Sequence, residues 1–240
     1  MPIMSRRSLV GSLAWGGAAG LWPIRSWALP SGGERIMFKA YRNGSEIGWH
    51  RLSFSADAKR LLVDIEIHFE VTFAFLTFYR YRHRNRETWQ DGRLVALDTT
   101  TDDDGERFAV RAEAKGEELV VENAAGDVVL LPGDTLPSSY WHERTVERER
   151  WLDTQSGRLA RSTVERLGAE PIEAAGRTVT ATRYRLRGDI DCELWYHERR
   201  WSKLRFSASD GSIIEYALEA ATGDGAAWLA PAGPLGLAPT

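Results

Sequence analysis

One predicted strand carries chemically interesting polar side chains on the face that should point into the protein. His83, Asn85 and Glu87 occupy every second position between Tyr81 and Trp89. Polar groups of this kind are buried only where they find hydrogen-bond partners. A histidine close to a carboxylate can also act as a general base or hold a metal ion.

The partners of these side chains follow from the turn at Asp91-Gly92. With a two-residue hairpin loop, Asp98 lies opposite Asn85 and Thr100 lies opposite His83. We therefore expect these four side chains to form one cluster. The cluster has three interpretations: catalysis by His83 with Asp98, a satisfied hydrogen-bond network, or the lining of a ligand site. The predicted ligand-binding residues are Tyr81, His83, Asn85, Trp89, Asp98, Thr100, Tyr140 and Trp141.

The opposite face of the same strand is strongly basic. Four arginines form this arginine row: Arg80, Arg82, Arg84 and Arg86. The preceding segment, 60–71, also alternates, and one of its faces carries Asp64, Glu66, His68 and Glu70. If the two segments form a hairpin that turns near Ala74 or Phe75, the acidic and basic rows meet and fix the register. We expect a solvated row of weak ion pairs. The alternative is that the arginines recognise an anionic headgroup or a sugar acid.

Alternation with a period of two residues continues along most of the chain, and turn residues separate the segments about every ten residues. The pattern predicts an all-β fold, an antiparallel meander that forms a barrel or a strongly curved half-barrel. The predicted strands are 35–42, 46–55, 60–71, 78–89, 94–101, 107–114, 118–122, 127–131, 158–167, 178–187, 191–197, 201–208 and 212–219. One short helical insert is expected near 138–148, with Ser138 or Ser139 as its cap.

The first 28 residues have the parts of an export signal. Arg6 and Arg7 precede a mild apolar run, and small residues lie around a cleavage site at Ala28. Adjacent arginines favour the twin-arginine export machinery, with the general secretory route as the alternative. The run is too short to span a bilayer. We expect a cleaved signal and a periplasmic protein; an uncleaved anchor or an ordinary N-terminal arm are the alternatives.

The amino-acid composition indicates which kinds of partner the protein can bind and how its domains are organised. The chain has 31 basic and 34 acidic residues, and removal of the signal takes away three arginines and no acids. An acidic chain of this kind gives no electrostatic reason to bind nucleic acid or an anionic membrane. We predict a single β domain over 29–220, without a transmembrane span, and a disordered tail over 221–240 that is rich in Ala, Gly and Pro. Cys192 is the only cysteine, so no intrachain disulfide can form.

Short motifs for metals and cofactors are incomplete in this sequence. His142-Glu143 and His197-Glu198 each begin the zinc-protease pattern H-E-x-x-H. Val146 and Trp201 occupy the positions that need the second histidine. We predict neither a metal nor a cofactor.

Several short segments carry a family resemblance. They are Asn43-Gly44 followed by Gly48, 79–83, 89–92, 138–141, 152–157 and 194–196. Together they resemble an uncharacterised family of exported proteobacterial proteins, a domain of unknown function, over almost all of the mature chain. The resemblance implies an envelope protein with a barrel or half-barrel fold. It implies no known activity and no catalytic residues.

These observations favour a non-enzymatic periplasmic protein that binds a lipid or glycan of the cell envelope in a β trough. Trp and Tyr side chains suit such a site because they offer flat apolar faces with a polar edge. One alternative is a hydrolase or isomerase that acts on an envelope substrate through His83 and Asp98. Another is a structural or assembly factor that makes protein contacts near 140–142.

Overall fold

The computed structural model describes residues 33–56, 59–73 and 76–222. The predicted signal, with Arg6, Arg7 and Ala28, lies outside the described residues. The strands are β1 (Arg35–Arg42), β2 (Ser45–Ala56), β3 (Arg60–Phe73), β4 (Leu76–Gln90), β5 (Arg93–Asp103), β6 (Glu106–Lys115), β7 (Glu118–Asn123), β8 (Val128–Pro132), β9 (Leu136–Pro137), β10 (Arg150–Leu152), β11 (Leu159–Ala174), β12 (Arg177–Gly188), β13 (Cys192–His197), β14 (Arg200–Ser207) and β15 (Ile213–Thr222). A short 3-10 helix, η1, spans Glu143–Glu147.

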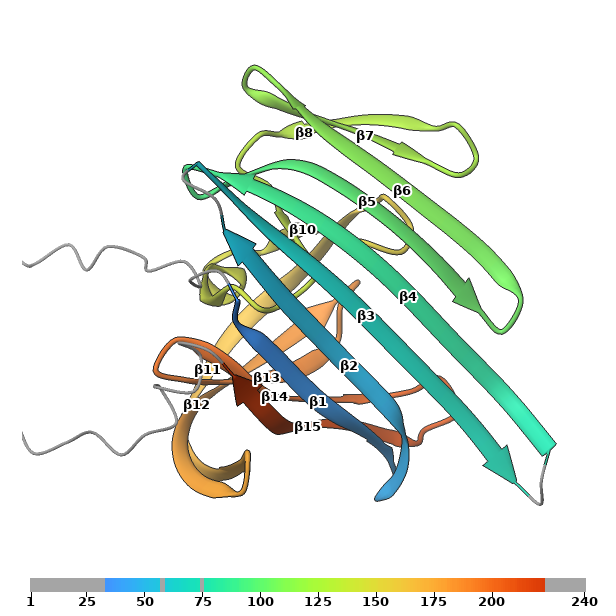
Figure 1. Cartoon of the computed structure of the whole chain (residues 1–240), viewed down its shortest axis with the longest axis vertical. Coiled ribbons are helices and arrows are strands. Elements are labelled where there is room, and N and C mark those ends of the chain that lie inside the picture. The colour runs from blue at the N-terminus through green and yellow to red at the C-terminus, as the bar shows by residue number, and fades with distance from the viewer. Residues whose placement is uncertain (1–32, 57–58, 74–75, 223–240) are drawn as a thin grey trace, which may run out of the picture.

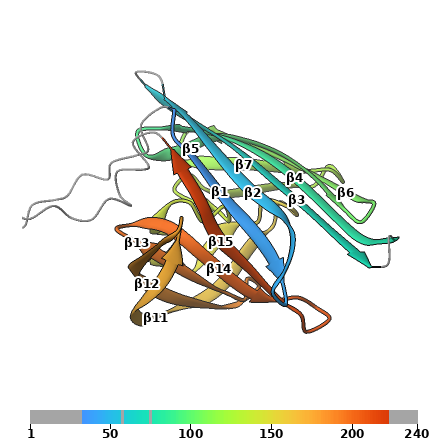
Figure 2. The same cartoon turned by 60° about the horizontal axis from the view of Figure 1, so that its bottom comes forward.

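All of these strands belong to one sheet, in the order β8-β7-β6-β5-β4-β3-β2-β1-β15-β14-β13-β12-β11-β10-β9. Neighbours are antiparallel except β9 and β10, which run parallel. The sheet bends back on itself, so that β1 to β7 form one wall and β11 to β14 form the other, with β15 beside β1 between them (Figures 1 and 2). Among the described residues the edge strands β8 and β9 do not pair with each other. The predicted all-β fold is confirmed, and the sheet is curved but open.

Alternation in the sequence explains how each strand contributes to the core. On β3, for example, Leu61, Val63 and Ile65 are buried on the inner face. Tight turns reverse the chain where the sequence allows positive φ: Asn43 and Gly44 adopt φ values of 49° and 85°. Such values suit the two-residue hairpin turns that match the twist of the flanking strands.

The segment between β8 and β11 lies between the two walls instead of continuing the meander. Trp141 packs against Phe54 of β2 at 5.4 Å and against Trp89 of β4 at 5.2 Å between ring centroids. Tyr140 packs against Trp201 of β14 at 5.9 Å. The insert therefore fills the interior of the curved sheet and joins its two walls.

The predicted helical insert is shorter than expected and has a different cap. The His142 ring accepts a hydrogen bond from the backbone N–H of Arg144, so that His142 caps η1. Ser138 instead accepts a hydrogen bond from the backbone N–H of Thr154 at 3.2 Å. No helix in the described part of the chain is long and apolar enough to cross a lipid bilayer.

The last strand extends beyond its predicted end. Ala221 and Thr222 pair with Ile36 and Arg35 of β1, so that these two residues belong to the sheet and not to a disordered tail. The remainder of the predicted tail, 223–240, lies outside the described residues.

Candidate functional site

The β3–β4 hairpin has the predicted register, and it directs the arginine row away from the interior. Arg86 lies opposite Asp64 and donates to it at 2.7 Å, and Arg84 lies opposite Glu66. The side chains of Arg84 and Arg86 are 81% and 70% exposed. Exposed pairs of this kind contribute little to stability. Their main consequence is that the alternate residues of β4, including His83, face inward.

The β4–β5 hairpin differs from the prediction by one residue. A bulge opposite Thr88 and Trp89 leaves Val95 as an extra residue in β5. His83 therefore lies opposite Thr101, and the two side chains are 2.8 Å apart in a hydrogen bond. A shift of one residue turns every following side chain to the other face of a sheet.

The shift removes two of the predicted site residues from the interior. Asp98 lies opposite Arg86 and Thr100 opposite Arg84, and both are exposed on the outer face. The predicted cluster of His83, Asn85, Asp98 and Thr100 is therefore wrong. The proposed pair of His83 with Asp98 cannot perform base catalysis, because the two side chains lie on opposite faces of the sheet.

Three other predicted site residues surround a buried carboxylate. Glu87 is fully buried and accepts hydrogen bonds of 2.9 Å from the amide of Asn85 and from the indoles of Trp89 and Trp141. Burial raises the pKa of Glu87, and these donors act in the opposite direction. The group joins the insert to β4. Asn85, Trp89 and Trp141 are occupied in this network and do not line the main cavity.

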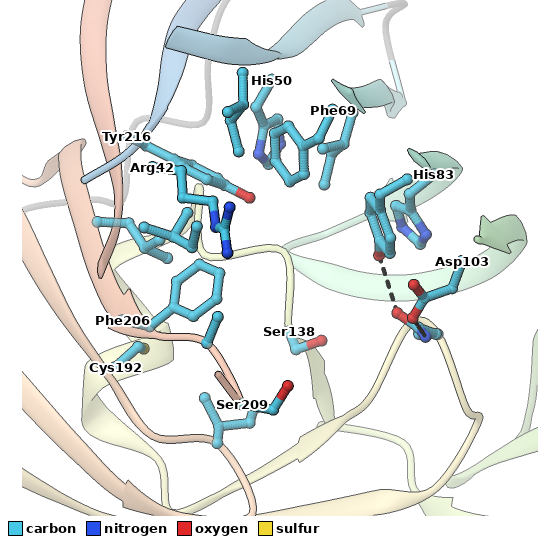
Figure 3. A pocket seen from close by; sticks show the side chains of 18 of the residues that line it. Arg42, His50, Phe69, His83, Asp103, Ser138, Cys192, Phe206, Ser209 and Tyr216 are labelled. Atoms are coloured by element: carbon cyan, nitrogen blue, oxygen red, sulfur yellow. Dashed lines mark hydrogen bonds between the residues drawn. The ribbon is translucent and has the colours of Figure 1, made fainter. Parts of the chain in front are cut away.

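The remaining predicted residues, Tyr81, His83 and Tyr140, line a cavity of about 810 Å³ between the two walls. Its apolar lining includes Ile65, Ile67 and Phe69 of β3, Leu204 and Phe206 of β14, and Tyr216 of β15. Figure 3 shows His50, Phe69 and Tyr216 along one side of this space, with His83 and Asp103 on another.

The prediction of a protein-contact surface at 140–142 is not met, because Trp141 and His142 are buried.

His50 is the most unusual group in the cavity lining. It is only 3% exposed, and neither ring nitrogen has a hydrogen-bond partner among the described residues. Its ring packs edge-on against Trp201 at 5.2 Å and Tyr216 at 5.5 Å. Burial lowers the pKa of His50 to about 3, so the ring is neutral at pH 7. His50 is not among the predicted site residues, although alternation places it on the same face as Leu52 and Phe54.

A chain of hydrogen bonds forms one edge of the cavity. Tyr81 donates to the Gln155 side chain at 3.0 Å, and Gln155 donates to Asp103 at 3.2 Å. Tyr79 donates to the same aspartate at 2.7 Å. The chain connects β4 and β5 to the loop after β10, which also brings Asp153 into the lining. No local pattern in the sequence indicated Gln155, Asp103 or Asp153, because the contacts depend on the position of the insert.

The second cavity histidine is also neutral. Burial lowers the pKa of His83 to about 4, and the nearby charge of Asp153 only partly opposes this effect. Both imidazoles therefore offer one donor and one acceptor nitrogen at neutral pH. Within the residues that the structure describes, no group of His, Cys, Asp and Glu side chains is placed to hold a metal ion.

An open, curved antiparallel sheet around a cavity of ligand size defines a β-barrel-like protein. The chain belongs to the family described as "Domain of unknown function (DUF6134)", which matches residues 38–219. Its fold is similar to that of the β-barrel-like protein of domain of unknown function DUF1849 from Brucella abortus. That likeness has a TM-score of 0.58 and 13% sequence identity, and it covers 81% of this chain and 99% of the other. No curated protein gives a significant sequence match to the chain.

Proposed function

We propose that this protein binds an apolar or amphipathic small molecule, such as a lipid of the cell envelope, in the cavity between its two walls. The observation that carries the proposal is His50, a buried imidazole that faces the cavity without a hydrogen-bond partner among the described residues. Leaving such a group unpaired costs about 1–3 kcal/mol. A bound molecule with a polar group would recover that cost.

The shape and chemistry of the cavity support the same proposal. Ligand sites are usually concave, mostly apolar and about 300–1,000 Å³ in volume, with a few polar groups that orient the ligand. This cavity has a volume of about 810 Å³. Ile65, Ile67 and Phe69 supply an apolar wall, and His50 and His83 are among the polar groups of the lining.

We further propose that the protein works in the periplasm. The support is the N-terminal sequence, in which paired arginines precede an apolar run and a small-residue cleavage site. A cell fractionation experiment with a C-terminal epitope tag tests the location, and substitution of Arg6 and Arg7 by lysine tests the twin-arginine route. Retention of the wild-type protein in the cytoplasm would contradict this part of the proposal.

Binding is tested with an apolar fluorescent probe, N-phenyl-1-naphthylamine. Two variants each introduce a tryptophan into β3, one on its inner face and one on its outer face. Ile67→Trp puts a large side chain into the cavity, since Ile67 lies in its lining. Leu62→Trp places the same side chain on the outer face of the same strand, where Leu62 is 37% exposed. We expect wild type and L62W to enhance probe fluorescence and I67W to lose the enhancement.

Two results would overturn the proposed function. One is the absence of any enhancement with folded wild-type protein, and the other is equal enhancement with I67W and L62W. Native mass spectrometry of protein purified from the periplasm then identifies the mass of any molecule that copurifies.

A further inference from the structure

Building on the proposed function, we infer that the cavity selects a cationic amphiphile, a molecule with an apolar body and an ammonium head. The polar lining of the cavity is rich in acceptors and in negative charge, and an ammonium group has only donors and a positive charge.

The charge balance of the lining is the first step of the argument. Five aspartates contribute to it: Asp103, Asp153, Asp189, Asp191 and Asp210. Arg42 is the one lysine or arginine in the lining within the described part of the chain. It is already engaged by Asp210 and by Ser212, whose hydroxyl lies 3.0 Å from its Nε. The cavity therefore has excess negative charge.

Asp103 and Asp153 are the carboxylates best placed to attract a cationic ligand. Both are half-buried, and both have only neutral donors as partners. Asp103 accepts from Tyr79 and Gln155. Asp153 accepts from the backbone N–H of Gln155 at 2.8 Å and from the Ser156 hydroxyl at 3.0 Å. In the part of the chain that the structure describes, the partners of both carboxylates are these neutral groups and include no lysine or arginine side chain. Their negative charges are therefore available to a ligand.

The unpartnered His50 is independent evidence for a ligand in the same space. It is buried, aimed into the cavity and neutral, and it adds an acceptor nitrogen without adding a positive charge. Within the described part of the lining, an anionic head such as a carboxylate or a phosphate would meet unbalanced aspartates and no cation other than Arg42, which Asp210 already engages. Like charges repel strongly where water is scarce. An ammonium group is attracted by the same aspartates.

Aromatic rings complete the site for a cation. Tyr81 stacks on Phe69 with 5.6 Å between ring centroids, and Phe69 meets the edge of Tyr216 at 5.6 Å. Gln155 accepts from the Tyr81 hydroxyl and contacts both Asp103 and Asp153, so the two carboxylates lie close to this aromatic group. Burial raises the pKa of Tyr81, and the charges of Asp103 and Asp153 raise it further. A cation over an aromatic face gains additional attraction. The neighbouring Ile65 and Ile67 can then cover the apolar body of the ligand.

Three probes of equal chain length test the inference: octylammonium, octanol and octanoate. They are titrated into the intact protein by isothermal titration calorimetry at low salt. We expect octylammonium to bind at least tenfold more tightly than octanoate, with octanol between them. If octanoate binds as tightly as octylammonium or more tightly, the inference is wrong and the proposed function stands. If none of the three probes binds and N-phenyl-1-naphthylamine also fails to bind, the proposed function itself is wrong.

Matched substitutions locate the effect. Asp103→Asn and Asp153→Asn together should weaken octylammonium binding at least fivefold and leave octanol binding unchanged. Asp98→Asn makes the same chemical change on the outer face and should leave both affinities unchanged. Unchanged octylammonium binding in the folded double variant would overturn the assignment.

A measurement on the wild type covers the case in which the double variant does not fold. Raising NaCl from about 50 to about 500 mM shortens the screening length. Octylammonium binding should weaken over this range, whereas octanol binding should not. Equal salt responses of the two probes would contradict a charge-selective cavity.

Discussion

Trp141 and Glu87 lie far apart in the sequence and are joined by a hydrogen bond of 2.9 Å in the protein interior. Trp89 donates to the same carboxylate oxygen at 2.9 Å, and Asn85 donates to the other oxygen. One buried side chain on β4 therefore holds the insert against the first wall. Since the loop that follows β10 also supplies part of the cavity lining, the Glu87 network positions the candidate site indirectly.

Replacing Glu87 by alanine should strongly destabilise the protein. The change leaves four buried donors, on Asn85, Trp89, Ser139 and Trp141, without their acceptor, and each such group costs about 1–3 kcal/mol. We expect Glu87→Ala to lower the free energy of unfolding by at least about 3 kcal/mol, measured by urea denaturation. Glu87→Gln keeps the shape and one acceptor oxygen, and it should lose less.

The matched control for this prediction is Glu70→Ala on the outer face of the same hairpin. Glu70 lies 3.7 Å from Arg80 in an exposed pair. Its removal should change the free energy of unfolding by less than about 1 kcal/mol. Equal losses in E87A and E70A would show that the buried network does not carry the stability assigned to it.

Stability should fall in mild acid because three buried histidines, His50, His83 and His142, resist protonation. Burial lowers the pKa of His50 to about 3 and those of His83 and His142 to about 4, whereas an unfolded chain gives histidine a pKa of about 6.5. Between these values the unfolded state binds more protons, so the stability is fully present above about pH 6.5 and is lost as the pH falls towards the folded values. Urea titrations at about pH 7.5 and about pH 4.5 should differ by ~2 kcal/mol or more for each histidine.

Histidine variants separate this effect from the titration of carboxylates. His50→Leu should reduce the loss of stability between the two pH values. His68→Leu should not, because His68 lies on the outer face, stacked on Trp49 at 6.0 Å. The same pH dependence in H50L and wild type would exclude His50 as a source of the acid sensitivity.

Alternation of residue types was sufficient to predict most of the strands and one hairpin register, but not β9 and β10 or the full length of β11. In β3 and β4, apolar, acidic and basic residues all repeat with the same period, so that a shift by one residue would bury charges. The sequence of β5 contains no such constraint near its start, where Leu94, Val95 and Ala96 are all apolar. Any of these residues can be accommodated as the bulge. The predicted inward positions of Asp98 and Thr100 were consequently wrong, whereas His83 is buried on the inner face as predicted.

The site could be predicted only in part because much of it depends on the insert. Ser138, Ser139 and the following aromatic residues have no periodic pattern that indicates their partners. The parallel pairing of β9 with β10 forms between segments of two and three residues, too short to be recognised from the sequence. Gln155 and Asp153 reach the cavity through this arrangement, so that their roles follow from tertiary structure and not from local propensity.

Glycine at position 48 should be required for the close packing of β2 against β3. Gly48 has a φ of 150°, and a Cβ at this position would lie 1.9 Å from the backbone oxygen of His68. We expect Gly48→Ala to cost at least about 3 kcal/mol, because backbone and not a flexible side chain must move. Gly92→Ala is the control, since Gly92 has a φ of 74° and open space around it. Its cost should be about 1 kcal/mol by thermal or urea unfolding, and equal costs would show that the contact with His68 is unimportant.

The only cysteine should react slowly in the native protein. Cys192 is 5% exposed, and burial together with Asp191 and Glu193 raises the pKa of its thiol to about 12. The thiolate is the reactive form, so we expect alkylation by iodoacetamide at about pH 8 to be at least a hundredfold slower than in urea-unfolded protein. Rapid alkylation of the native protein would show that the cavity wall around β13 opens readily.

Cysteine labelling can also test the bulge that separates the predicted from the observed site. In a Cys192→Ser background, Thr100→Cys should react rapidly, because Thr100 is exposed on the outer face of β5. Thr101→Cys should react at least tenfold more slowly, because Thr101 is buried beside His83. A register without the bulge would exchange the two rates, since it would turn Thr100 inward and Thr101 outward. The comparison thus decides by one pair of rates whether Thr101 or Thr100 is the partner of His83.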